Sequence, residues 1–138
     1  MNTQLNKTLD SLRKQEPFSL ISEVDFEKVR ENATAKYFEM GERITRQDEF
    51  SSHIYLILKG EIRLLAESFE HKGLITIDKR GPGQFFGWVS LLRGEPCETT
   101  QATEDVYTIS IPSSIFIELC KTDNFLRFFE NTTNSHEV

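Results

Sequence analysis

The chain has 138 residues, of which 38% are hydrophobic and 11% are aromatic, and eleven of them are phenylalanines. A sequence of this length and composition is expected to fold as one domain with a packed core. Its formal net charge of −6 produces no field that would concentrate phosphates, so we expect no nucleic acid as a partner of this domain.

Cysteines and histidines are too scattered to predict a metal site or a disulfide framework. Cys97 and Cys120 have no paired spacing, and His53, His71 and His136 lie far apart in the sequence. The sequence has no nucleophile elbow and no HExxH motif either. We therefore predict reduced thiols, no metal, no cofactor and no catalytic activity.

The N-terminal segment lacks the apolar run that forms a signal peptide. No window reaches the ~18 continuous apolar residues of a membrane span. We therefore expect a cytoplasmic chain that makes no membrane contact of its own.

Residues 1–36 are predicted to form a helical lead-in. Pro17 separates two runs, and Ser22 is a candidate N-cap of the second run. Apolar side chains recur in both runs at the spacing of a helix face: Leu5, Leu9, Leu12, Val24, Phe26 and Val29.

Residues 37–112 are predicted to form a β-roll. The segment KYFEMGERITRQ is expected to be a hairpin about Gly41, and SSHIYLILKGEIRLLAE a second hairpin about Gly60. LITIDK and DVYTISIP follow as two more strands. The last strand is expected to place three residues on one face: Tyr107, Ile109 and Ile111. Short strands between helical ends indicate a mainly β fold with flanking helices, a double-stranded β-helix or jelly roll.

Residues 113–131 are predicted to form C-terminal helices, followed by a polar tail or linker at 132–138. Ser113 or Ser114 can cap the first of them. Its expected buried residues are Ile115, Phe116 and Leu119. An aromatic stripe then follows, which is expected to pack against the roll or a partner because so much apolar surface is unstable in water. The stripe consists of Phe125, Phe128 and Phe129.

The stretch GPGQFFGWVSLLRGEPCETTQA, residues 81–102, combines glycines with an apolar run. Gly81-Pro82-Gly83 predicts a tight turn, and Gly87 permits a close backbone approach before one turn of helix. The amides at the start of such a turn form an anion-binding nest. The glycine spacing matches neither a dinucleotide fingerprint nor a P-loop, so a packed corner of the roll without a ligand is the competing interpretation.

This arrangement resembles the phosphate-binding cassette of cyclic nucleotide-binding domains. The matching pieces are GQFFG, the pair LL, GEP and TQA before a strand, and MGERI, HIYLILKGEIRLL and DVYTIS are similar to that family's strands. The resemblance covers residues 18–130. It implies a β-roll of the catabolite-activator type, a small-molecule effector, and a C-terminal hinge helix carrying Phe125, Phe128 and Phe129 that couples ligand binding to a larger protein. The cassette residues that it implies are Phe86, Gly87, Trp88, Val89, Ser90, Leu91, Arg93, Pro96, Cys97, Glu98 and Thr99.

The variant GWVSLLRGEPCE looks most like the N-terminal regulatory domain of cyanobacterial ABC exporters that also carry a peptidase domain. This closer resemblance implies peptidase and ATPase modules downstream in the same chain. It also implies a role in bacteriocin export, at the cytoplasmic face of an inner-membrane transporter.

Two positions depart from the family's cassette. A cassette that binds cyclic AMP has a glutamate directly after the glycine, which accepts from the ribose 2′-OH, and an arginine directly after the proline, which pairs with the phosphate. Here Trp88 and Cys97 stand at these positions, and Glu98 is expected to repel a phosphate further. We therefore predict that the domain does not bind cyclic AMP at micromolar concentrations.

Several alternatives stay open at this level. Trp88 is either a platform that stacks a ligand or a plug of the vacated pocket. Arg93 either replaces the missing arginine or is solvated on a turn, and Cys97 is either a redox sensor or an inert thiol. The domain could instead be a genuine sensor of another cyclic nucleotide, or the sensor half of a transcription factor whose helix-turn-helix would follow Val138.

Overall fold

A computed structural model of the chain describes residues 3–68, 70 and 73–132. His71, His136 and the part of the predicted tail beyond Thr132 lie outside the described residues. The fold consists of two compact units, one formed by residues 1–34 with 114–138 and the other by residues 35–113. The first holds the helical ends and the second holds the strands.

The helical unit contains the two ends of the chain. Its elements are α1 (Thr3–Leu12), η1 (Phe18–Leu20), α2 (Glu23–Asn32), α4 (Ser113–Leu119) and α5 (Asp123–Thr132). The hydroxyl of Ser22 accepts a hydrogen bond of 3.1 Å from the Asp25 amide, which confirms the predicted cap of α2. Phe26 and Val29 are buried, whereas Val24 is exposed, so the predicted apolar face of α2 is wrong at this residue.

The aromatic residues of the C-terminal helices form a ring cluster inside this unit. Phe116 lies 6.0 Å from Phe125 and 5.0 Å from Phe129, measured between ring centroids, and all three are fully buried. Phe128 is half-buried and its ring lies 5.2 Å from that of Phe129. Edge-to-face pairs of this kind add to the free energy of burial.

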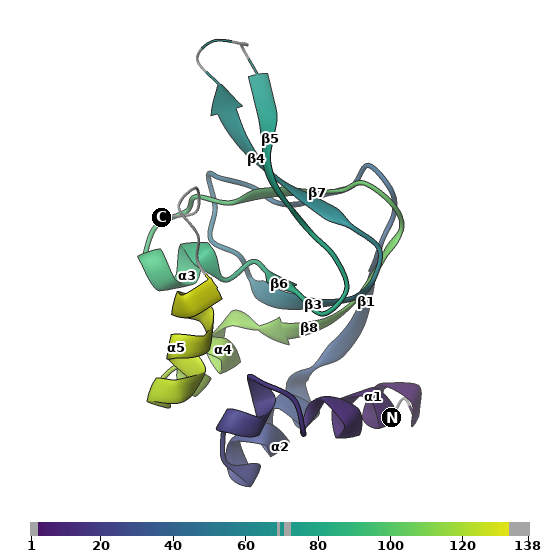
Figure 1. The fold of residues 1–138 in the computed structure, drawn as a ribbon, viewed down its shortest axis with the longest axis vertical. Helices are drawn as coiled ribbons and strands as arrows, with labels where there is room; N and C mark the ends of the chain where they lie inside the picture. Colours follow the sequence, from purple (N-terminus) through teal and green to yellow (C-terminus); the bar gives the residue numbers. More distant parts are fainter. Residues whose placement is uncertain (1–2, 69, 71–72, 133–138) are drawn as a thin grey trace. The chain divides into compact units, whose positions relative to one another are not determined.

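The strand unit consists of two four-stranded sheets with the orders β1-β8-β3-β6 and β2-β7-β4-β5 (Figure 1). The strands are β1 (Thr34–Phe38), β2 (Arg43–Thr45), β3 (His53–Lys59), β4 (Ile62–Ser68), β5 (Gly73–Arg80), β6 (Phe85–Phe86), β7 (Thr99–Ala102) and β8 (Val106–Pro112). A short helix, α3 (Val89–Arg93), lies between β6 and β7 in the sequence. The predicted mainly β roll is confirmed, and the first three residues of β1 lie inside the predicted helical lead-in.

The core of the roll is built from inward-facing residues of both sheets. It contains Phe38, Tyr55, Ile57, Ile62, Leu64, Phe86, Ala102 and Val106. Burial of each large apolar side chain contributes about 1.5–3 kcal/mol to the free energy of folding. This core fixes β3, which follows the cavity loop, and β6, which precedes the cassette helix.

Both predicted hairpins are wrong in their pairing. β1 and β2 belong to different sheets, and so do β3 and β4. The turn at Gly60 is a corner between the sheets, where φ is 102° and a Cβ would lie 2.4 Å from the carbonyl oxygen of Asp105. The alternating pattern predicted the strands, but a local pattern carries no information about which strand will be the neighbour.

The hairpin that does form joins β4 to β5. Ser68 pairs with Gly73, and the register continues to Ile62 opposite Arg80. Figure 1 shows this hairpin extending beyond the other strands of its unit. On β8, Ile109 and Ile111 are buried as predicted, but Tyr107 is exposed. Its neighbours Val106 and Thr108 are buried, so the start of the strand belongs to the core while the Tyr107 ring lies outside it, 5.0 Å from the ring of Tyr37.

Candidate functional site

The glycine-rich stretch folds as a turn, a short strand and a short helix. The Gly83 amide donates to the Ile57 carbonyl at 2.8 Å, and the Gln84 amide donates to the Gly81 carbonyl at 3.1 Å, which closes the predicted tight turn. Gly87 has φ of 89°, and a Cβ there would lie 2.8 Å from the carbonyl oxygen of His53. Only glycine fits this position without strain, because the backbone of β3 already occupies the space.

The predicted anion-binding nest is present, and a carboxylate of the chain itself occupies it. Glu98 Oε1 accepts a hydrogen bond of 2.7 Å from the Ser90 amide, and Glu98 Oε2 accepts one of 3.1 Å from the Gly87 amide. Glu98 is only 5% exposed. We predicted this carboxylate as a repelling charge beside the nest, whereas it lies inside the nest and accepts from its amides.

Arg80 supplies a positive charge near this buried carboxylate. Its guanidinium is 6% exposed, donates to the Phe85 carbonyl at 3.0 Å and lies 3.6 Å from Asp78 Oδ2. Burial lowers the pKa of Arg80, while the charges of Asp78 and Glu98 raise it. No sequence motif indicated Arg80. The available signal was a basic residue at the C-terminal end of a predicted strand, β5.

Two opposing effects act on the protonation of Glu98. Burial raises the pKa of the Glu98 carboxyl, and the hydrogen bonds from Ser90 and Gly87 and the charge of Arg80 lower it. The net direction is upward. The side chain is therefore held in the nest against a desolvation penalty that its hydrogen bonds and the charge of Arg80 only partly offset.

The segment around the nest also carries three other predicted cassette residues, Trp88, Arg93 and Cys97. Trp88 is 3% exposed and offers no open face on which a ligand could stack. Arg93 is exposed and pairs with Glu95 Oε1 at 3.0 Å. Burial raises the pKa of the half-buried Cys97 thiol, and Glu98 raises it further, which favours an inert thiol.

The remaining cassette residues form the walls of this region. Phe86, Val89, Ser90 and Thr99 are buried, Leu91 is half-buried and Pro96 is exposed. The Thr99 hydroxyl accepts a hydrogen bond of 3.0 Å from the Gln47 amide, which ties the cassette to the loop after β2. Phe125, Phe128 and Phe129 belong to the helical unit.

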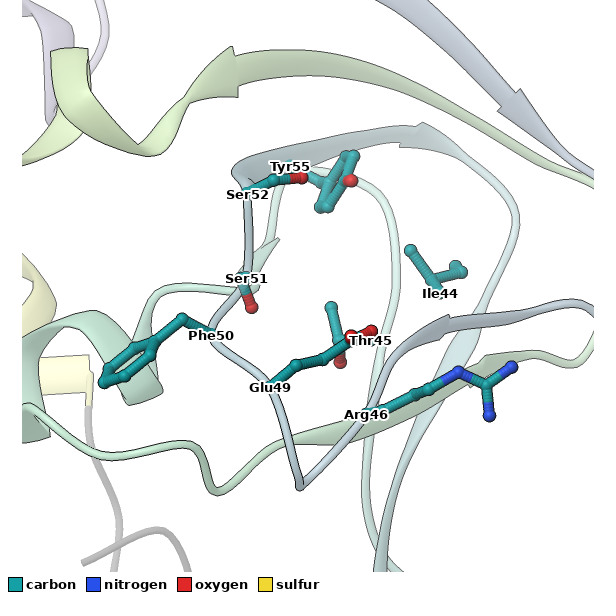
Figure 2. Close-up of a pocket in the computed structure, with 8 residues that line it drawn as sticks. All are labelled: Ile44, Thr45, Arg46, Glu49, Phe50, Ser51, Ser52 and Tyr55. Carbon is teal, nitrogen blue, oxygen red and sulfur yellow. The ribbon is translucent and has the colours of Figure 1, made fainter.

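A cavity of about 200 Å³ lies beside β2 and β3 (Figure 2). It is lined by Ile44, Thr45, Arg46, Glu49, Phe50, Ser51, Ser52 and Tyr55. The ring of Tyr55 is stacked on Phe86 of β6 at a centroid distance of 4.8 Å. No sequence pattern predicted this cavity, because its polar residues form no recognised motif.

Within residues 3–68, 70 and 73–132, no group of His, Cys, Asp and Glu side chains could hold a metal ion. Every helix in the same residues is too short or too polar to span a bilayer.

Comparison with known proteins gives one family. Residues 35–123 match the sequence model of the family described as cyclic nucleotide-binding domain. The chain is 28% identical over 90 residues to the cAMP-dependent protein kinase type I-alpha regulatory subunit of Mesocricetus auratus, and the alignment covers 62% of this chain and 54% of that protein. The chain thus spans about half the length of this curated relative.

The fold is shared with solved structures of regulatory domains, including the following two. One is the regulatory domain of Toxoplasma gondii PKA co-crystallised with cAMP, with a TM-score of 0.78 and 20% identity, covering 94% of this chain and 51% of that chain. The other is the regulatory subunit of a cAMP-independent protein kinase A from Trypanosoma cruzi bound to guanosine, with a TM-score of 0.81 and 13% identity, covering 99% of this chain and 50% of that chain. At these identities the likeness establishes the fold, and a ligand has to be argued from the site.

Proposed function

Because the chain belongs to the cyclic nucleotide-binding domain family, we propose that it is a non-catalytic regulatory domain whose cassette is filled by its own Glu98 and does not bind cyclic AMP. The observation that carries this proposal is the pair of hydrogen bonds from the Gly87 and Ser90 amides to the Glu98 carboxylate. These amides are the donors that the nest offers to an anion.

A cyclic phosphate can enter the nest only if it displaces Glu98. Each hydrogen bond to a charged group contributes about 1.5–3 kcal/mol, so losing two of them costs several kcal/mol. Every 1.4 kcal/mol weakens binding about tenfold. A phosphate in the nest would accept from the same two amides, but the arginine that would pair with it in the family's cassette is replaced by Cys97, so that ion pair is missing from the exchange.

Calorimetric titration with cyclic AMP and cyclic GMP tests the proposal. We expect no binding to the wild-type chain at micromolar nucleotide. The triple variant Trp88→Glu, Cys97→Arg, Glu98→Ala supplies both polar anchors and empties the nest, and we expect it to bind at least about a hundredfold more tightly than wild type. Tight binding of either nucleotide by the wild-type chain would overturn the proposal.

The double variant Trp88→Glu, Cys97→Arg is the matched control for the role of Glu98. It carries both anchors of the family's cassette but keeps the carboxylate in the nest. We expect its affinity for cyclic AMP to remain well below that of the triple variant. Equal affinities of the two variants would show that Glu98 leaves the nest at no cost.

A second candidate function is a sensor of an uncharged nucleoside. It is favoured by the presence of a buried carboxylate where a phosphate would lie, since such a site rejects anions and accepts hydroxyl donors. The Trypanosoma cruzi regulatory subunit of the same fold, which is cAMP-independent and bound to guanosine, supports this reading. Guanosine binding that is lost in Glu98→Ala would establish it.

We also propose that the domain is the N-terminal part of a larger ABC exporter, followed by peptidase and ATPase modules and located at the cytoplasmic face of the membrane. The sequence GWVSLLRGEPCE motivates this context. The gene sequence downstream of Val138 tests it, because an exporter requires those motifs there. A helix-turn-helix in their place would favour the transcription-factor alternative.

In such a protein α5 would carry the regulatory response to the neighbouring modules. Phe125 and Phe129 are fully buried and Phe128 is half-buried, so a shift of this helix would repack the ring cluster. Phe128→Ala in the full-length protein should change both its stability and its activity. A change in stability alone would leave α5 as static core.

A further inference from the structure

The cavity beside β2 and β3 is formed by a single continuous segment of the strand unit. Ile44 and Thr45 come from β2, Tyr55 comes from β3, and the loop between these strands supplies the other lining residues. In Figure 2 the side chains of Phe50 and Arg46 point away from the cavity. The groups that remain around it are mainly hydroxyls and one carboxylate.

Some of these hydroxyls already have partners within the roll. Thr45 Oγ1 lies 2.8 Å from Thr100 Oγ1. Ser52 Oγ lies 2.8 Å from His53 Nδ1, and its hydroxyl also interacts with that of Tyr55. These bonds fix the positions of the cavity walls and leave each hydroxyl with further donor or acceptor capacity.

Ser51 differs from these residues. Its side chain is in the cavity wall with the residue only 7% exposed, and its Oγ has no hydrogen-bond partner among the residues that the structure describes. An unsatisfied buried hydroxyl costs about 1–3 kcal/mol. Groups of this kind in a native structure require an explanation, and a molecule bound in the adjacent cavity supplies one.

The charge at the cavity selects the chemistry of its ligand. Glu49 lines it with a carboxylate, which accepts hydrogen bonds and repels anions. Arg46, the only basic lining residue, is exposed and directed outward. A carboxylate surrounded by hydroxyls matches a neutral molecule with several hydroxyl groups, and above all a vicinal diol whose two O–H groups can donate to both carboxylate oxygens.

The size of the cavity limits the ligand. Its volume of about 200 Å³ lies below the ~300–1,000 Å³ of sites for drug-sized molecules. A pentose fits this limit, either as a free sugar or as the sugar of a nucleoside whose base extends out of the cavity.

We propose that this cavity binds the vicinal diol of a neutral, pentose-sized sugar, with Glu49 accepting hydrogen bonds from the diol and the hydroxyls of Ser51 and Tyr55 completing the site. None of its lining residues belongs to the cassette, so the site is separate from the nest that Glu98 fills. Tyr55 connects the two regions, because its ring is stacked on Phe86 and lies beside Gly87. A bound sugar would therefore stiffen the wall of the cassette.

The test is saturation-transfer NMR on the 138-residue chain followed by calorimetry, with D-ribose, adenosine and 2′,3′-dideoxyadenosine as probes. Ribose and adenosine should bind, and the dideoxy analogue, which lacks the diol, should bind at least about tenfold more weakly than adenosine. Binding of adenosine without ribose would identify a nucleoside as the source of the diol, and equal binding would identify a free sugar.

Variants locate the binding site. Glu49→Gln should lower the affinity for ribose and for adenosine at least about tenfold, and Ser51→Ala should lower both affinities several-fold. Asp48→Asn is the control, since Asp48 is an exposed neighbouring acid outside the cavity, and it should change affinity less than about twofold.

Two outcomes would overturn the inference. One is the absence of binding by both ribose and adenosine at millimolar concentration, which would mean that the cavity holds only water. The other is binding that survives Glu49→Gln or removal of the diol, which would move the ligand elsewhere. Glu98→Ala separates this result from the proposed function, because it should leave ribose binding intact whether or not it restores affinity for cyclic AMP.

Discussion

The cassette turn and the loop between β2 and β3 border the same tyrosine but differ in how their polar groups are satisfied. In the cassette, the carboxylate of Glu98 accepts from two backbone amides and is almost fully buried. In the loop, Glu49 is exposed at a cavity and Ser51 has a buried hydroxyl without a partner among the described residues. The family motif marks where a ligand site was expected, whereas in the loop a buried hydroxyl without a partner among the described residues lines an open cavity.

The largest expected effect comes from the close contact between the cassette backbone at Gly87 and β3. Gly87→Ala places a Cβ 2.8 Å from the His53 carbonyl oxygen at a φ of 89°. We expect it to lower the free energy of unfolding by at least about 3 kcal/mol, measured by urea denaturation. Gly41→Ala is the control, since it has a positive φ but open space around it, and it should cost only about 1–2 kcal/mol. Equal losses would mean that the contact with β3 is not tight.

Removing each carboxylate in turn compares the two regions directly. Glu98→Ala leaves the amides of Gly87 and Ser90 without their acceptor, so we expect a loss of about 2–4 kcal/mol in the free energy of unfolding. Glu49→Gln removes an exposed charge and should change stability by less than about 0.5 kcal/mol. Urea denaturation of both variants under the same conditions measures this difference in the free energy of unfolding. A near-neutral Glu98→Ala would contradict a filled nest.

Acidity provides a smaller and more selective test. The pKa of Glu98 is raised in the folded state, so the folded chain holds this proton more tightly than the unfolded chain. The contribution of Glu98 to stability therefore falls as the pH rises from the ordinary carboxyl pKa of 4.5 through the folded value. The stability of wild type relative to Glu98→Gln should increase on going from about pH 7 to about pH 5, with a slope of at most ~1.4 kcal/mol per pH unit. The opposite slope would indicate a lowered pKa of Glu98, which would mean that the hydrogen bonds to its charged form outweigh the cost of burial.

The smallest expected effect concerns the unpaired hydroxyl of the loop. Ser51→Ala removes a buried polar atom that has no partner in the described residues, so in the absence of ligand it should leave stability unchanged or raise it by up to about 1 kcal/mol. The same change in a paired residue, Thr45→Val, breaks its contact with Thr100 and should lower stability by about 1 kcal/mol. Thermal unfolding of both variants checks this difference, and a clear loss in Ser51→Ala would show that its hydroxyl is satisfied in solution.

Local patterns predicted the parts of the molecule whose cause is local. The serine before α2 caps it because the capping hydrogen bond needs only the next three residues. Gly83 and Gly87 predicted a turn and a close approach because both have a positive φ that few other residues tolerate. The departures at Trp88 and Cys97 were also predictable from the sequence, since each is a residue type at a fixed position of the family's motif.

What the sequence by itself determined is therefore the mainly β roll, its flanking helices and the loss of two cassette anchors. The tertiary structure decided the strand partners, the direction of the Glu98 side chain and the existence of the cavity. Strand pairing depends on which sheet has a free edge, so the turn at Gly60 became a corner between sheets and not a hairpin. Glu98 enters the nest because the chain turns back after α3, which brings it to amides eight and eleven residues earlier. The cavity depends on the packing of β2, β3 and their loop, and such a space exists only once distant backbone segments have been fixed against one another.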